Sequence, residues 1–140
     1  MVVKFHHYEE GDVFRVKARD GDDLGGEFQE VAGPAWSLKD DDNNVYLSFG
    51  LLPSNEGKIG NLWAVVSDDA RGHGIKMIKF ARAVIDHALK EKGFARIQSI
   101  VREDKPEYYR FSQAVGLEAE GLMKKAAPDG GNLYLFARTV

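Results

Sequence analysis

Residues 68–77, Asp68-Asp69-Ala70-Arg71-Gly72-His73-Gly74-Ile75-Lys76-Met77, join a strongly apolar run to a long amphipathic one. The apolar run is Leu62-Trp63-Ala64-Val65-Val66, and the amphipathic segment covers residues 75–92. A buried strand, a turn with two glycines and a helix start together form an anion site, because N–H groups at a helix N-terminus and the helix dipole favour negative charge. The stretch therefore predicts a phosphate or pyrophosphate site.

The segments on either side of this turn have different periods. The near-continuous apolar centre of residues 59–67 is typical of a strand covered on both faces. From Ile75 onward a helical period predicts one apolar face, and Gly93 stands where a C-terminal cap belongs. The residues of that face are Met77, Ile78, Ala81, Val84, Ile85, Ala88 and Leu89.

The rest of the chain predicts further strands and helices around this unit. Asp12 is expected to cap a short helix that begins at Val13, and Asp40-Asp41-Asp42-Asn43-Asn44 reads as the turn of a hairpin. The remaining predicted elements are strands at 2–9, 95–102, 117–125 and 132–139 and a helix from Lys105-Pro106 to about Val115, ended by Gly116. This order predicts a single α/β domain, residues 1–140, with about seven strands.

Composition excludes several classes of protein. Hydrophobic content of 44% and charged content of 29% suit a soluble globular domain, and the net charge of −3 gives no reason to expect nucleic-acid or anionic-membrane binding. The absence of cysteine excludes disulfides and a thiol nucleophile. No apolar run approaches the roughly 18 residues of a membrane span, so a cytoplasmic location is expected. His6 and His7 point to opposite faces of a strand, and no metal is implied.

The element order and the central turn together resemble the GNAT superfamily of acetyl-coenzyme A-dependent N-acetyltransferases. The family motif is Gln/Arg-x-x-Gly-x-Gly/Ala. The stretch from Arg71 to Lys76 fits the Arg and the first Gly, but Lys76 replaces the final small residue. The run Gly116-Leu117-Glu118-Ala119-Glu120-Gly121 is similar to a common GNAT ending. The resemblance spans the chain and implies a mixed central sheet of six to seven strands with helices on both faces.

A closer similarity is to small GNAT-like proteins of short-tailed phages, some of them internal virion proteins. It rests on Gly33-Pro34-Ala35-Trp36, on Trp63-Ala64-Val65-Val66-Ser67 and on Pro128-Asp129-Gly130 with the strand Leu133–Arg138. This similarity implies a phage-encoded protein in the host cytoplasm or in the virion.

The GNAT resemblance implies acetyl-CoA as co-substrate and assigns its binding site. Amides from about residue 72 to 77 would bind the pyrophosphate, with positive charge from Arg71 and Lys76, and the end of the preceding strand would run beside the pantetheine arm. The alternative is that the two glycines only shape a tight turn. The predicted coenzyme-binding residues are Val65, Val66, Ser67, Arg71, Gly72, His73, Gly74, Ile75 and Lys76.

Three residues are candidates for catalysis. In many GNAT enzymes a Tyr four residues before the closing Gly protonates the leaving thiolate, and here that position is Ser112. Tyr109 shares roughly its helix face and is a substitute, or else a packing residue. Glu103, next to Asp104 just past the strand at 95–102, is the candidate base, although surface solvation explains both carboxylates equally well.

These observations lead to three hypotheses. The first is an N-acetyltransferase acting on an amine of a small molecule or protein, and the acidic stretch at 20–30 favours a cationic amine on charge alone. The second is a catalytically weak or inactive GNAT-fold phage protein that binds a host protein or serves in the virion. The third, a generic phosphate-binding domain, lacks a Gly-Lys-Ser/Thr signature. A monomer and a dimer are both compatible with the sequence.

Overall fold

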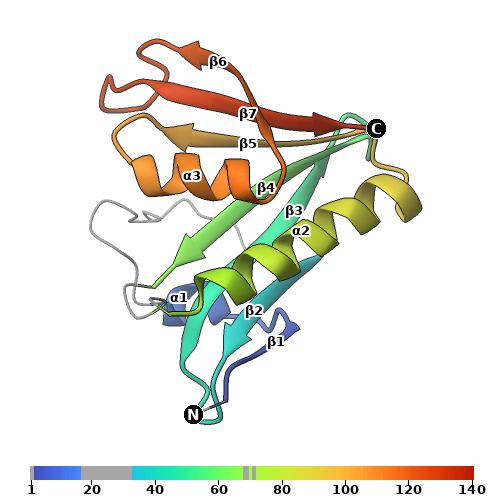
Figure 1. Ribbon diagram of the computed structural model, residues 1–140, viewed down its shortest axis with the longest axis vertical. Coiled ribbons are helices and arrows are strands. Elements are labelled where there is room, and N and C mark those ends of the chain that lie inside the picture. Colours follow the sequence, from blue (N-terminus) through green and yellow to red (C-terminus); the bar gives the residue numbers. More distant parts are fainter. Residues whose placement is uncertain (1, 17–32, 68–69, 71) are drawn as a thin grey trace. The chain divides into compact units, whose positions relative to one another are not determined.

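The computed structural model describes residues 2–16, 33–67, 70 and 72–140. The predicted order of strands and helices is confirmed in these residues, with boundaries that differ by a few positions (Figure 1). The elements are β1 (Lys4–His7), α1 (Asp12–Arg15), β2 (Ala35–Lys39), β3 (Val45–Ser54), β4 (Ile59–Val66), α2 (Gly74–Glu91), β5 (Arg96–Arg102), α3 (Pro106–Ala114), β6 (Glu118–Met123) and β7 (Leu133–Thr139).

The strands form a seven-stranded mixed sheet in the order β1-β2-β3-β4-β5-β7-β6. The expected hairpin around the Asp/Asn cluster is confirmed by the antiparallel pairing of β2 with β3. Strands β4 and β5, which α2 connects, are parallel neighbours, from Ile59 opposite Arg96 to Asn61 opposite Gln98. The chain divides into two compact units, Met1–Leu52 with Leu62–Gly74 and Pro53–Asn61 with Ile75–Val140.

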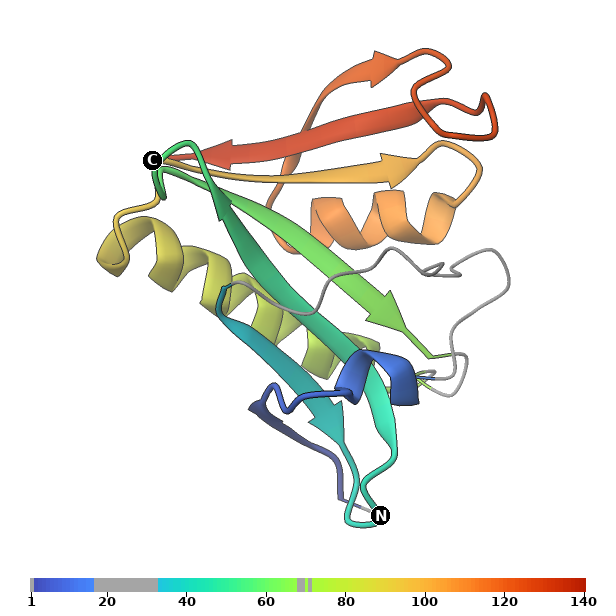
Figure 2. The same ribbon diagram turned by 180° about the vertical axis from the view of Figure 1, so that it is seen from behind.

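The first unit is built on the antiparallel strands β1, β2 and β3, which lie side by side in Figure 2. Its core cluster comprises Val13, Val16, Val45 and Val65, with Tyr8 and Trp63 packed against it. The cluster joins α1, through Val13, to β3 and β4, through Val45 and Val65. Valine suits these positions because β-branched residues fit the pleated surface of a sheet. The cluster holds the start of the chain and the end of β4 in one core.

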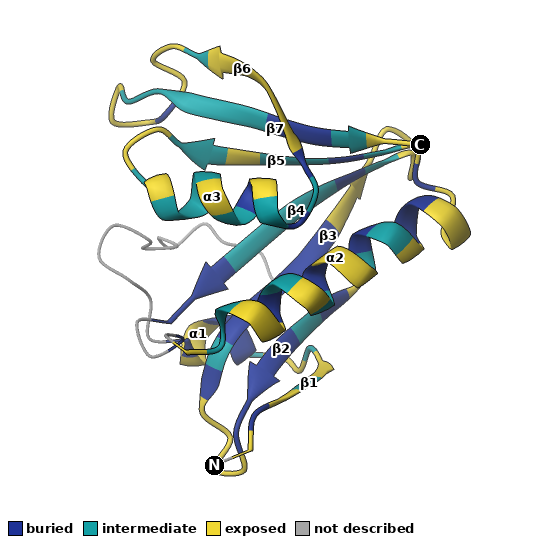
Figure 3. Ribbon diagram, viewed as in Figure 1, coloured by how far each residue is buried: buried dark blue, intermediate teal, exposed yellow. Residues whose placement is uncertain are grey.

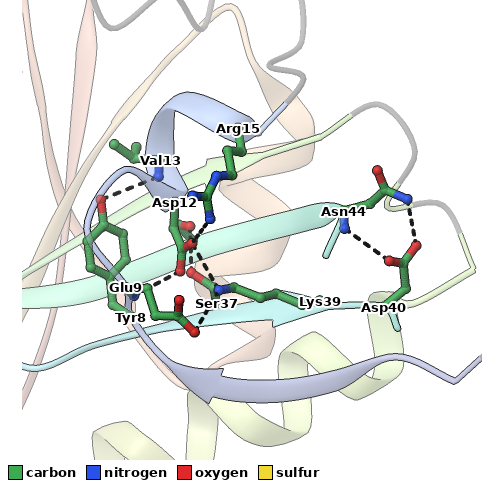
Figure 4. A network of polar contacts seen from close by, with 10 residues as sticks. Tyr8, Glu9, Asp12, Val13, Arg15, Ser37, Lys39, Asp40 and Asn44 are labelled. Carbon is green, nitrogen blue, oxygen red and sulfur yellow. Dashed lines mark hydrogen bonds and ion pairs between the residues drawn. The ribbon is translucent and has the colours of Figure 1, made fainter. Parts of the chain in front are cut away.

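The expectation that Asp12 caps α1 is wrong. The N-cap is Gly11, with φ of 88°, and Asp12 lies inside the first turn. Its carboxylate instead accepts a hydrogen bond from Glu9 N–H at 2.9 Å and lies 2.9 Å from the ammonium of Lys39 (Figure 4). Both side chains are buried, at 0% and 4% exposure. These partners outside the helix, an amide before it and an ammonium on β2, engage the carboxylate, which accounts for the difference.

The second unit packs its helices on apolar faces that the sequence pattern indicates. On α2 the buried residues are Met77, Ala81, Ile85, Ala88 and Leu89, whereas Ile78 and Val84 are only half-buried (Figure 3). Gly93 ends this helix with φ of 79°, as the pattern predicts. Asp86 on α2 forms an ion pair with Arg138 on β7. At the sheet edge, β6 is exposed along almost its whole length.

Gly50 on β3 has no space for a side chain. A Cβ there would lie 2.7 Å from the carbonyl oxygen of Pro34 and 2.9 Å from Trp63 Nε1. We expect Gly50→Ala to lower the free energy of unfolding by about 1–3 kcal/mol, because backbone cannot yield as a flexible side chain can. Urea unfolding measures the change. Gly121→Ala, whose Cβ would meet nothing within 4 Å, is the control, and equal stability of the two variants would contradict the expectation.

None of the helices in the described residues combines the length and apolar character needed to cross a membrane.

Candidate functional site

The end of β4 and the following turn are anchored by main-chain hydrogen bonds. Ser67 is 2% exposed, and its N–H donates to the carbonyl of Tyr46 on β3 at 2.8 Å. Ala70 N–H donates to Ser67 at 3.1 Å, and His73 N–H donates to Ala70 at 3.0 Å. Val65 and Val66 are both buried. Main-chain hydrogen bonds therefore connect Ser67, Ala70 and His73 in succession before α2 begins. Arg71, one of the predicted coenzyme-binding residues, lies outside the described residues.

The two glycines of the turn have different reasons to be glycine. Gly72 has φ of 89°, a left-handed conformation that disfavours any residue with a Cβ. Gly74 has no such φ, and a Cβ added there would meet no atom of the described residues within 4 Å. Within this part of the chain, neither backbone conformation nor packing therefore accounts for glycine at position 74. Open space at a helix start is the geometry that a bound phosphate requires.

The first turn of α2 carries a charge pattern that favours an anion. Helix N-termini usually attract Asp or Glu, but this first turn holds no acidic residue. It contains instead the exposed Lys76, and Ile75 beside it is 73% exposed. An anionic ligand at this helix start would interact favourably with the helix dipole, by about 0.3–1 kcal/mol. The residues present therefore fit a phosphate-bearing group, and Lys76 would lie within the same helical turn.

His73, one of the predicted coenzyme-binding residues, contacts a neighbouring strand. Its half-buried ring packs against the ring of Tyr46, with centroids 5.3 Å apart. An aromatic ring on β3 therefore contacts the residue between the two glycines. The sequence pattern gave no reason to connect Tyr46 with the turn.

The candidate proton donors lie on α3, on one side of the second unit. Ser112 is buried, with 3% exposure. Tyr109 is half-buried, and its ring meets Tyr134 and Phe136 of β7 edge-on at 5.0 and 4.9 Å between centroids. Tyr109 thus has the packing role considered for it from sequence. Such packing also fixes the direction in which its hydroxyl points.

The two carboxylates after β5 have different surroundings. Asp104 accepts from Arg102 at 3.0 and 3.1 Å, and that hydrogen-bonded contact lowers the pKa of Asp104 below its usual value. Glu103 is exposed and accepts one hydrogen bond, from Asn132 at 3.3 Å. A carboxylate engaged by arginine is a weak base. The geometry therefore favours Glu103 over Asp104 as the base.

Asn132 was not predicted as part of the site. Its Oδ1 accepts from Lys125 N–H at 2.9 Å, so its amide NH₂ is directed to Glu103. Glu103 N–H in turn donates to the carbonyl of Asn132 at 3.1 Å. Two hydrogen bonds therefore connect the turn after β5 with the loop before β7. Elsewhere in the described residues, no group of three His, Asp or Glu side chains is placed to hold a metal ion.

Comparison with known proteins identifies the fold. No protein family and no curated protein matches the sequence. Among solved structures, a GNAT-family acetyltransferase from Bacillus anthracis has a TM-score of 0.75 at 17% identity, covering 98% of this chain and 94% of that one. A chimera of the spermidine N-acetyltransferase SpeG from Vibrio cholerae and hSSAT has a TM-score of 0.74 at 10% identity, covering 98% and 95%.

A third similar structure, the ribosomal-protein-S5-alanine acetyltransferase of Vibrio fischeri, has a TM-score of 0.66 at 17% identity. It covers 76% of this chain, which in turn spans 61% of that protein. The chain thus has the fold of the GNAT acetyltransferases, as the sequence predicts.

Proposed function

We propose that this protein is an acetyl-CoA-dependent N-acetyltransferase of the GNAT superfamily. The observation that carries the proposal is the start of α2, where the described residues leave open space beside Gly74 and the first turn of the helix holds no acidic residue. On the GNAT fold, that turn is where the sequence motif implies the pyrophosphate. Val65, Val66 and Ser67 precede it on the strand that would run beside the pantetheine arm.

The reaction joins an amine nitrogen to the acetyl carbonyl carbon and breaks the carbon–sulfur bond of the thioester. The amine must lose a proton and the leaving thiolate must gain one. We assign the first role to Glu103, which is exposed and outside the Arg102 contact. We assign the second to Tyr109, since the Ser112 hydroxyl is a poorer acid and its residue is buried.

We expect Tyr109→Phe to lower kcat on the order of 10²-fold while leaving the Kd for acetyl-CoA unchanged. The ring and its packing on Tyr134 and Phe136 remain, so only the hydroxyl is lost. Steady-state kinetics and calorimetric titration measure the two quantities. Ser112→Ala is the comparison: a larger loss of kcat there than in Tyr109→Phe would transfer the role of proton donor to Ser112.

The direct test of the function has two parts. Calorimetric titration with acetyl-CoA reports binding, and its absence at millimolar ligand would remove the coenzyme claim. Release of free coenzyme thiol, followed with a thiol reagent, reports turnover without background because the chain has no cysteine. The acceptor panel begins with spermidine and with a peptide that has an N-terminal alanine, since similar structures are named for those substrates.

A second candidate function is binding without turnover, to a host protein or within a virion. It is favoured by the burial of Ser112 at the position where the family usually has its acidic Tyr, and by Lys76 in the small-residue position of the motif. Binding of acetyl-CoA with no thiol release across amines and host-cell extract would support this candidate. Amine-dependent release would eliminate it. The first candidate places the protein in the cytoplasm of the cell, where acetyl-CoA is available, and the second places it in the host cytoplasm or in the virion.

A further inference from the structure

The carboxylate of Asp40 makes more hydrogen bonds than a hairpin turn requires. Its residue is 6% exposed, and Oδ1 accepts from the N–H groups of Asp42 and Asn44, each at 2.9 Å. Oδ2 accepts from the Asn44 side chain at 2.9 Å and from the hydroxyl of Tyr46 at 2.8 Å. Figure 4 shows the Asn44 contacts on both oxygens. The first three bonds shape the turn, and the fourth orients a side chain beyond it.

Tyr46 connects this hairpin to the β4–α2 turn at two points. Its carbonyl accepts from Ser67 N–H at 2.8 Å, where the chain leaves β4. Its ring packs against His73 with an interplanar angle of 59°, just before α2 begins. The hydroxyl at the far end of the same ring is held by Asp40. One residue therefore contacts the beginning and the end of the turn.

The turn needs such support because of its own composition. Gly72 and Gly74 have no side chains, and glycine gains the most backbone freedom when it is not held. His73 lies between them, so its side chain is the one that can tie this part of the turn to the sheet. A phosphate site requires its amides within about 0.5 Å of the binding geometry. A ring contact at His73 limits the conformations that the two glycines can sample.

We propose that Tyr46, with its hydroxyl fixed by Asp40, is a positioning residue that holds Ser67 and His73, which flank the β4–α2 turn, in the positions that coenzyme binding requires. The inference rests on the proposed function for the role of the turn, but the contacts lie within the first unit and can be tested without ligand. The Asp/Asn cluster of residues 40–44 then serves the coenzyme site as well as the hairpin.

Two substitutions at Tyr46 give a graded test. Tyr46→Leu removes both the ring contact with His73 and the hydroxyl, whereas Tyr46→Phe keeps the ring and loses the bond to Asp40. Tyr8→Leu is the matched control, because it removes a tyrosine ring that packs on Trp63 in the core of the same unit. The measurements are amide exchange of Ser67 and His73, followed by NMR, and the Kd for acetyl-CoA from calorimetry.

We expect Tyr46→Leu to speed exchange at both amides and to weaken acetyl-CoA binding about tenfold, with an effect of about twofold to threefold in Tyr46→Phe. Tyr8→Leu should leave both measurements near wild type after correction for global stability. Unchanged exchange and affinity in Tyr46→Leu, or equal effects in Tyr8→Leu, would overturn the positioning role. A wild-type protein that fails to bind acetyl-CoA overturns the proposed function instead. Faster amide exchange in Tyr46→Leu would then still show that Tyr46 restrains Ser67 and His73.

Discussion

Gly74→Glu is expected to abolish acetyl-CoA binding, with a loss of at least about 100-fold in affinity. A carboxylate at the start of α2 would occupy the open space beside Gly74 and face the pyrophosphate with like charge. Such juxtaposition costs several kcal/mol, and about 2.8 kcal/mol corresponds to 100-fold. Calorimetric titration measures the effect.

The same substitution should not unfold the protein. No atom of the residues that the structure describes lies within 4 Å of the new Cβ, and the backbone at Gly74 is not left-handed. An acidic residue in the first turn also interacts favourably with the helix dipole. Gly121→Glu on β6 is the matched control, since it adds the same side chain to an equally open glycine away from the turn. Wild-type affinity in Gly74→Glu would place the coenzyme site elsewhere.

Lys39→Met is expected to lower the free energy of unfolding by about 3–5 kcal/mol. The ammonium of Lys39 lies 2.9 Å from Asp12 and 3.4 Å from Glu9. It interacts with these carboxylates through its charge rather than through well-aligned hydrogen bonds. Removing it leaves the fully buried Asp12 carboxylate without its buried cation, with the half-exposed Arg15 at 3.2 Å still in contact. Breaking a buried pair in this way is strongly destabilising. Urea unfolding measures the change.

Two comparisons separate this effect from a general loss of charge. Lys79→Met on the exposed face of α2 should change stability by less than about 0.5 kcal/mol. The double variant Asp12→Leu with Lys39→Met should regain most of the loss, because apolar residues of similar volume replace a buried pair with little change or with a gain. A double variant as unstable as the single one would contradict this explanation.

The same carboxylate makes stability depend on pH. Burial raises the pKa of Asp12, but the hydrogen bond from Glu9 N–H and the contacts with Lys39 and Ser37 outweigh it and leave the pKa below its usual 3.8. A group with a depressed folded-state pKa contributes stability above its unfolded pKa and loses it as the pH falls through the folded value. We expect the stability contribution of Asp12 to decline below about pH 4, with a smaller decline in Asp12→Asn. An equal loss of stability at low pH in the wild type and in Asp12→Asn would assign the pH dependence to other carboxylates.

The segment from β4 through α2 was predictable because its sequence signals are local. The change of hydrophobic period from β4 to α2 depends only on neighbouring residues, and so do the glycines that follow α2 and α3, Gly93 and Gly116. The hairpin around residues 40–44 was predictable for the same reason. These patterns set the order of elements, and the parallel pairing of β4 with β5 follows from that order.

The contacts within the candidate site were not predictable because they join residues far apart in the chain. Asp12 was expected to cap its own helix, but its partner Lys39 lies on a strand whose position the sequence does not reveal. The ring of Tyr46 meets His73 only once β3 is placed beside the turn. Its distance from Gly116 in the sequence identified Ser112 as the position where the family usually has its catalytic Tyr. The burial of Ser112 depends on tertiary packing, which that distance does not reveal.

Asn132 couples two loops that would otherwise vary independently. Its backbone and side chain both form hydrogen bonds with Glu103. Arg102, which precedes Glu103 in the chain, pairs with Asp129 in the same loop before β7. An insertion or deletion between β6 and β7 would therefore displace the candidate base as well as the loop. Loop grafting intended to change the acceptor would therefore have to retain Asp129 and Asn132.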